Sequence, residues 1–81
     1  MQVRLLYFAV LRDIIGEREA TVSIPEGTRA SSIWERLKSE HPQLAAHSTA
    51  PMIAINEAYA TGDTELHDGD ELAFIPPVAG G

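Results

Sequence analysis

One amphipathic segment constrains the fold more than any other feature of this sequence. Its apolar residues recur at offsets 0, 3, 4 and 7, the spacing of one stripe along a helix; they are Ala30, Ile33, Trp34 and Leu37. Thr28 stands where its hydroxyl can cap the first turn. Pro42 disfavours helical geometry at the preceding residue, so the helix should end near Glu40.

The chain before this helix has the pattern of two β-strands. Residues 2–10 and 19–24 are rich in branched and aromatic side chains and would pair as a hairpin. In the second strand, Ala20, Val22 and Ile24 should face inward. The connection, residues 11–16, predicts a helical turn closed by Gly16.

The chain after the helix predicts three further strands. They are residues 52–56, with Ile53 and Ile55 buried, then 58–60 and 71–75, after a loop at 43–51. Asn56-Glu57 and Asp68-Gly69 are turn signals. This order of elements describes an α+β roll, in which one main helix crosses a mixed sheet. The pattern alone leaves the strand order open.

Composition excludes several classes of function. The 81 residues suffice for one domain, and the 44% hydrophobic content supports a modest core. The absence of cysteine excludes disulfides, thiolate metal sites and a cysteine nucleophile. A formal charge of −6 argues against nucleic acid as a partner. Neither a membrane span nor a secretory signal is found, so a cytoplasmic location is the expectation.

No set of side chains predicts a self-contained enzyme. His41, His47 and His67 lack the spacing of metal ligands, and no metal site is expected. The carboxylates at 68–71 are better explained by turn chemistry. Apolar residues also fall on the strand face that Arg4 suggests is open to solvent, among them Phe8.

The last residues, Gly80-Gly81, form a thin tether because glycine has no Cβ. Pro76-Pro77 would end the last strand and stiffen the base of a tail that reaches about 20 Å when extended. Such a tail suits a protein whose reactive group is its own terminal carboxyl. The alternatives are a frayed end or an expression remnant for the glycines, and a simple strand terminator for the prolines.

Two stretches carry a resemblance to a known family. Asp-Gly-Asp-Glu at 68–71 with Pro-Pro-Val-Ala-Gly-Gly at 76–81, and Val-Arg-Leu-Leu-Tyr-Phe-Ala at 3–9, are similar to the small subunit of molybdopterin synthase. The order of elements matches along the whole chain. The resemblance implies a β-grasp (ubiquitin-like) fold, with a domain at 1–75 and a flexible tail at 76–81.

The resemblance also implies a function. A partner adenylyltransferase would activate the Gly81 carboxylate with ATP, and a sulfur donor protein would convert it to a thiocarboxylate. The tail would then enter the large subunit of molybdopterin synthase and donate sulfur to cyclic pyranopterin monophosphate. The chain itself would bind no cofactor and would be the sulfur-donating subunit of a heteromeric sulfurtransferase.

The same resemblance implies roles for particular residues. Gly81 would carry the reacting carbon, while the preceding tail threads the partner's active site; that segment is Pro76, Pro77, Val78, Ala79 and Gly80. Phe8, Tyr59 and Ile75 would form the apolar docking patch. The chain departs from the family at Ala79, where Ser or Thr is frequent, and at Ile75, where an aromatic residue is common.

Three alternatives stay open from the sequence. The chain could be a sulfur carrier for thiamine, cysteine or tRNA thiolation pathways, although the Pro-Pro-Val ending argues against this. It could be a ubiquitin-like modifier joined to lysines through Gly81. It could also be an interaction domain whose tail is inert.

Overall fold

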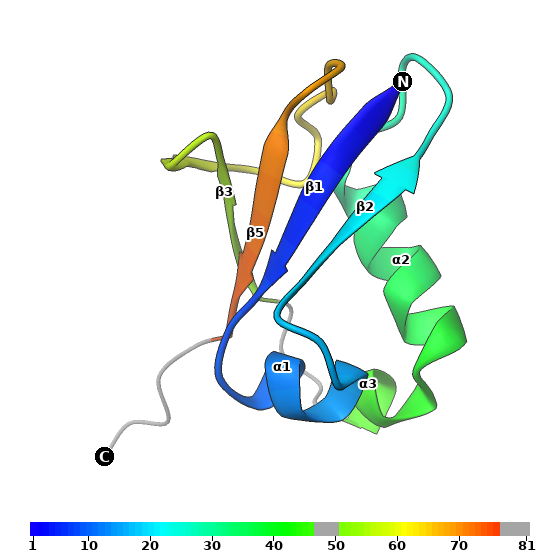
Figure 1. Ribbon diagram of the computed structural model, residues 1–81, viewed down its shortest axis with the longest axis vertical. Coiled ribbons are helices and arrows are strands. Elements are labelled where there is room, and N and C mark those ends of the chain that lie inside the picture. The colour runs from blue at the N-terminus through cyan, green and yellow to red at the C-terminus, as the bar shows by residue number, and fades with distance from the viewer. Residues whose placement is uncertain (47–50, 77–81) are drawn as a thin grey trace.

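The computed structural model describes residues 1–46 and 51–76. In chain order, its elements are β1 (Gln2–Tyr7), α1 (Val10–Ile15), β2 (Glu19–Ser23), α2 (Ala30–Glu40), α3 (Pro42–Ala46), β3 (Met52–Ile55), β4 (Ala58–Ala60) and β5 (Glu71–Ile75). The five strands form one sheet in the order β2-β1-β5-β3-β4 (Figure 1). β1 and β5 are parallel and every other pair is antiparallel. The predicted roll with a mixed sheet and one main helix is confirmed.

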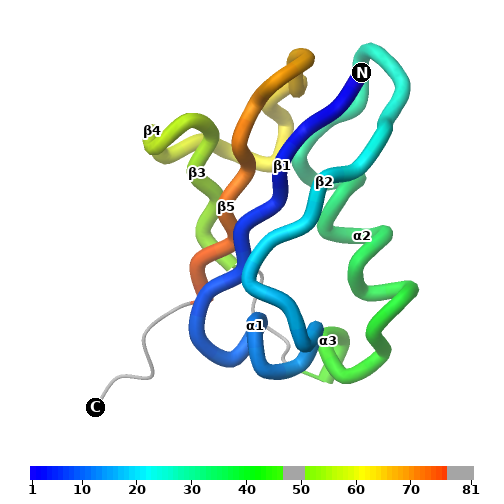
Figure 2. The backbone as a smooth tube through the Cα atoms, viewed as in Figure 1, coloured from blue at the N-terminus to red at the C-terminus, as the bar shows by residue number. Residues whose placement is uncertain are grey.

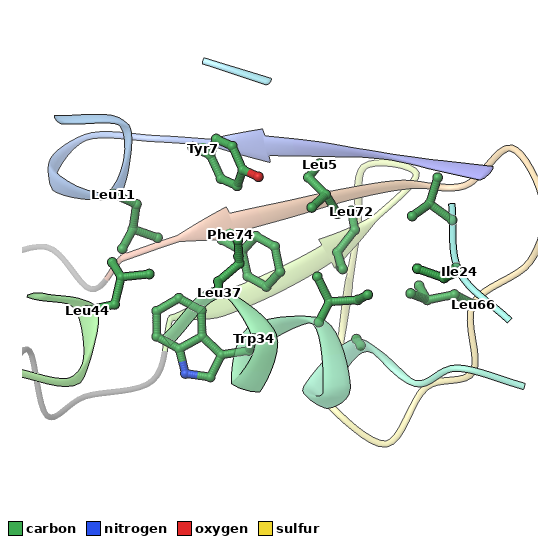
Figure 3. Packing of buried hydrophobic residues seen from close by; sticks show 13 residues of the cluster. Leu5, Tyr7, Leu11, Ile24, Trp34, Leu37, Leu44, Leu66, Leu72 and Phe74 are labelled. Carbon is green, nitrogen blue, oxygen red and sulfur yellow. The ribbon is translucent and has the colours of Figure 1, made fainter. Parts of the chain in front are cut away.

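The core lies between the sheet and α2. Phe74 is fully buried at its centre, with its ring centroid 6.4 Å from that of Tyr7 and 5.7 Å from that of Trp34. Figure 3 shows the side chains of Leu5, Leu72 and Phe74 projecting from the strands toward α2. The predicted helical stripe is confirmed, because all four of its residues are buried in this core: Ala30, Ile33, Trp34 and Leu37.

The turns explain where the first elements begin and end. β1 stops at Tyr7 rather than at the predicted Val10, because Ala9 adopts φ 51° and ψ −127° and redirects the chain. The Leu11 N–H donates to the Phe8 carbonyl at 3.1 Å, closing this turn. Gly16 ends α1, as predicted; it lies in the left-handed region and its N–H donates to the Arg12 carbonyl.

Two predictions around α2 are wrong. Thr28 does not cap the helix, because its hydroxyl donates to the Pro25 carbonyl at 2.7 Å and Arg29 occupies the N-cap position. The expected loop at 43–51 is helical at its start, since α3 spans Pro42–Ala46. Proline is well suited to a first helical turn, and the fully buried side chain of Leu44 holds α3 against the core.

The strands after the helices follow the predicted alternation with one difference. Ile53 and Ile55 face the core but are only half-buried, because β3 lies one strand from the sheet edge. Asn56 and Glu57 both adopt positive φ, at 51° and 70°, and turn β3 into β4 as predicted. None of the helices in the described part of the chain has the length and apolar character needed to cross a membrane.

Candidate docking face and base of the C-terminal segment

The face of the sheet that points away from α2 is apolar. Strand register aligns Leu6 with Ala73, Ala73 with Ala54, and Ala54 with Tyr59, so one row crosses four strands. A neighbouring row pairs Met52 with Ile75. We call this surface the outer apolar face; its residues are Leu6, Phe8, Met52, Ala54, Tyr59, Ala73 and Ile75.

The large side chains of the outer apolar face are open to solvent. Tyr59 is 74% exposed, Met52 50% and Phe8 46%, and they are the exposed large hydrophobic residues of the described chain. Ala54 and Ala73 lie in the rows between them and are buried, so the exposed surface is formed by the larger side chains around them. A group of exposed large apolar side chains on one face of a sheet indicates an interaction site.

The structure places the three predicted patch residues on this face of the sheet. Tyr59 and Ile75 belong to its aligned rows, and Phe8 lines a hollow together with Leu6 just beyond the end of β1. Met52 also lies on this face and was not among the predicted patch residues. Its alternation with the inward-facing Ile53 was the signal that would have placed it on the outer side.

A charged row borders the outer apolar face. The Arg4 guanidinium lies 2.8 Å from the Glu19 carboxylate and 3.4 Å from that of Glu71, joining β2, β1 and β5. The hydrogen bond to Glu19, with the negative charges of both carboxylates, raises the pKa of Arg4. The apolar surface is therefore limited on this side by a satisfied cluster of charges.

The Asp-Gly-Asp-Glu segment fastens the start of β5. Asp68 accepts a hydrogen bond from the Gln2 N–H at 2.8 Å. Asp70 accepts from the Asn56 side-chain amide at 2.9 Å and from the His67 N–H at 2.7 Å. These bonds confirm that the acidic residues serve a turn, and the described residues contain no group of His, Asp or Glu arranged to hold a metal ion.

β5 carries the chain to the base of the predicted tail. It is hydrogen-bonded on both sides, to β1 and β3, so its last residues have a fixed position in the sheet (Figure 2). Ile75 ends the strand and Pro76 is half-buried directly after it. The remaining tail residues of the prediction, 77–81, lie outside the described residues.

The described histidines do not converge on one site. His41 lines a pocket of about 170 Å³ between the β1–β2 hairpin and α2. The exposed ring of His67 lies 3.8 Å from the Asp70 carboxylate in a turn, and His47 lies outside the described residues. Burial raises the pKa of Tyr7, which lines the same pocket as His41, to about 12. A phenol so firmly protonated at neutral pH is a poor general base.

The fold and the outer face together define a ubiquitin-like β-grasp domain with an open apolar sheet surface. The model of the ThiS family matches residues 5–81, and the chain belongs to that family. The sequence is 39% identical to the human molybdopterin synthase sulfur carrier subunit, over 99% of this chain and 94% of the human protein. The resemblance seen in the sequence is thus confirmed.

Solved structures agree with this assignment. A putative molybdopterin converting factor subunit 1 from Pyrococcus furiosus superposes with a TM-score of 0.84 at 31% identity, covering 96% of this chain and 99% of that protein. The small archaeal modifier protein 1 from Methanosarcina acetivorans has a TM-score of 0.80 at 26% identity, covering 99% and 96% respectively. The β-grasp fold is therefore shared by proteins named for sulfur transfer and by proteins named as modifiers.

Proposed function

We propose that this chain is the sulfur carrier subunit of a molybdopterin synthase. The proposal is carried by the position of the outer apolar face, whose last row, Met52 and Ile75, lies at the end of β5 from which the Gly-Gly segment continues. A partner that covers this face would therefore bind next to the point from which the chain continues toward Gly81. The full-length similarity to the human sulfur carrier subunit supports the same function.

The proposed chemistry takes place on the carboxyl of Gly81. A carboxylate is a poor electrophile, so an adenylyltransferase first joins it to the AMP portion of ATP and releases pyrophosphate. The outer sulfur of a persulfide on the sulfur donor protein then attacks the acyl-adenylate and displaces AMP, and a thiol cleaves the resulting acyl disulfide, which leaves a thiocarboxylate on Gly81 and oxidises the thiols to a disulfide. The sulfur of this group is a nucleophile that the large subunit directs to cyclic pyranopterin monophosphate. Pro76, Pro77, Val78, Ala79 and Gly80 would thread the active site of that subunit.

The folded domain supplies no catalytic group in this scheme. Its part is to present a rigid docking surface, so that binding fixes the position of the reacting terminus. Phe8, Tyr59 and Ile75 are the proposed docking residues, and the exposed Met52 lies in line with Ile75. ATP would be bound by the adenylyltransferase and by no site on this chain.

Intact mass spectrometry tests the chemistry. After incubation with the adenylyltransferase, ATP and the sulfur donor, we expect the mass gain of an oxygen-to-sulfur exchange. A variant lacking Gly81 should keep the same melting temperature and show no gain. Sulfur transfer by that variant would contradict the proposal, and so would an unchanged mass of the intact chain.

A second candidate is a protein modifier, favoured by the structural likeness to the archaeal modifier protein. The same mass experiment, repeated with a cell extract, separates the two functions. Isopeptide-linked ladders that disappear on deletion of Gly81 would favour the modifier. A thiocarboxylate with no ladders, followed by formation of molybdopterin with the large subunit, would favour the sulfur carrier.

The docking surface is tested separately by binding to the large subunit. Phe8→Asp places a charge within the apolar contact and should weaken binding by at least 100-fold, about 3 kcal/mol, the loss typical of an interface hot spot. Ser39→Asp, on the exposed side of α2, is the matched control and should bind as the unaltered chain does. Equal binding by both variants would exclude the outer apolar face as the docking surface.

A further inference from the structure

A hollow with a cationic lining adjoins the outer apolar face. It has a volume of about 410 Å³ and lies beyond the end of β1, where α1 and the start of β2 approach each other. Leu6 and Phe8 of the outer apolar face form its apolar part. The charged residues that line it are Arg12, Arg18 and Glu19.

The two arginines of this hollow differ from most other basic residues of the chain. Arg4 and two cations of α2, Arg36 and Lys38, each lie within 4.0 Å of a carboxylate. Among residues 1–46 and 51–76, no such partner is found for Arg12 or Arg18, and both residues are exposed.

The neighbouring acidic groups leave this positive charge uncompensated. Glu19 shares the hollow, but its carboxylate is held at 2.8 Å by Arg4. Glu17, next to Arg18 in the sequence, lines the separate pocket beside α2. Asp13 follows Arg12 on α1 and is exposed, outside the lining of the hollow. A chain with a net charge of −6 thus presents, within the part that the structure describes, two guanidinium groups without an ion-pair partner beside its exposed apolar surface.

We propose that Arg12 and Arg18 form a cationic rim that receives carboxylate side chains of the protein that docks on the outer apolar face. The inference rests on the proposed function and names a property of the partner: an acidic pair next to the apolar contact. A guanidinium matches a carboxylate with two parallel hydrogen bonds, which gives orientation as well as attraction. The rim is continuous with the outer apolar face through Phe8, so one partner covers both.

Charges at the rim of an interface act mainly on the rate of association, because they steer the partners before contact. The test is a stopped-flow measurement of association with the large subunit, using the double variant Arg12→Glu/Arg18→Glu. At about 20 mM salt we expect association to slow by about tenfold or more, with a much smaller change in dissociation. At about 500 mM salt the difference should largely vanish, because screening shortens the range of the charges.

A second double variant controls for net charge. Arg29→Glu/Lys38→Glu reverses two cations that do not line the hollow. Each reversal changes the charge by two, so both double variants carry −10 in place of −6. The control should associate within about twofold of the unaltered chain at either salt concentration, since steering depends on where the charges lie. Arg12→Gln/Arg18→Gln should give an intermediate rate, and melting curves confirm that each variant is folded.

The outcomes separate this inference from the function on which it rests. Equal slowing by both reversed pairs would overturn the rim, because net charge alone would then explain the effect. A slowing that persists at high salt would overturn it too. If Phe8→Asp abolishes binding while the arginine variants bind normally, the docking face stands and the rim is rejected. If the unaltered chain does not bind the large subunit at all, both proposals fall.

Discussion

Two phenylalanines lie on opposite faces of the sheet, and substituting each one tests which face stabilises the fold and which is available for binding a partner. Phe74 is fully buried and its ring lies against those of Tyr7 and Trp34. Phe8 is 46% exposed at the edge of the outer apolar face. The same substitution, Phe→Ala, should therefore have very different effects at the two positions.

The magnitudes follow from burial. Removing a buried phenylalanine side chain costs about 3–5 kcal/mol in transfer and cavity terms. The whole domain, at about 0.05–0.15 kcal/mol per residue, has a free energy of unfolding of about 4–12 kcal/mol. Phe74→Ala thus removes a quarter or more of the stability. About half of the Phe8 side chain is buried, so Phe8→Ala should cost about 1 kcal/mol.

Thermal and urea unfolding, followed by circular dichroism, measure both effects. For a domain of this size 1 kcal/mol corresponds to about 4–8 °C. We expect Phe8→Ala to melt about 5 °C lower and Phe74→Ala at least 12 °C lower. If Phe74→Ala does not fold, Phe74→Leu replaces it, with an expected cost of about 1–2 kcal/mol against almost none for Phe8→Leu. Equal losses at the two positions would refute the assignment of the two faces.

Three further perturbations address the turns and the core. Asp70→Ala should lower the free energy of unfolding by about 1–2 kcal/mol in urea titrations, because the Asn56 amide and the His67 N–H lose their acceptor, and an unchanged midpoint would contradict this. Glu57→Gly should raise the free energy of unfolding by about 0.5–1 kcal/mol, because Glu57 is held at φ 70°, which glycine adopts without strain. A lower urea midpoint for this variant would show that no strain is relieved. Tyr7 has its pKa raised from 10.0 to about 12 on folding, so its contribution to stability is complete below pH 10 and is lost as the pH rises toward 12. Tyr7→Phe should flatten that alkaline decline in melting temperature, and an equally steep decline in the variant would refute the cause.

The sequence predicted the fold class because its evidence is local. The helical stripe from Ala30 to Leu37 and the alternation from Ala20 to Ile24 each report which side of one element is apolar. Gly16 and the Asn56-Glu57 pair predicted turns, and in the structure the chain turns at these residues with positive φ. These features need no knowledge of distant residues.

The errors arose where a distant contact decides a local conformation. α3 forms because Leu44 is buried against the core, and nothing in the composition of residues 42–46 required a helix there. Thr28 has a side chain that can cap a helix, but in the folded chain its hydroxyl donates to the Pro25 carbonyl instead. Local propensity is a weak preference that tertiary contacts of about 1 kcal/mol reverse.

For the candidate site too, some features could be predicted from the sequence and others came only from the structure. The Gly-Gly ending and the apolar character of Phe8 are visible in the sequence, and the resemblance they support was confirmed by the family match. The proposed roles of Phe8, Tyr59, Ile75 and residues 76–81 remain predictions. The alignment of Leu6, Ala73, Ala54 and Tyr59 in one row, and the place of Arg12 beside Phe8, came only from the structure.

Sequence by itself therefore determined which residues are apolar, which side of each strand or helix they occupy, and where the chain turns. Tertiary structure decided the strand order, above all the parallel pairing of β1 with β5, which joins the two ends of the domain. The physical reason is the range of the interactions. Periodicity reflects neighbours within a few positions, whereas strand pairing and surface patches depend on burying apolar area between segments far apart along the chain.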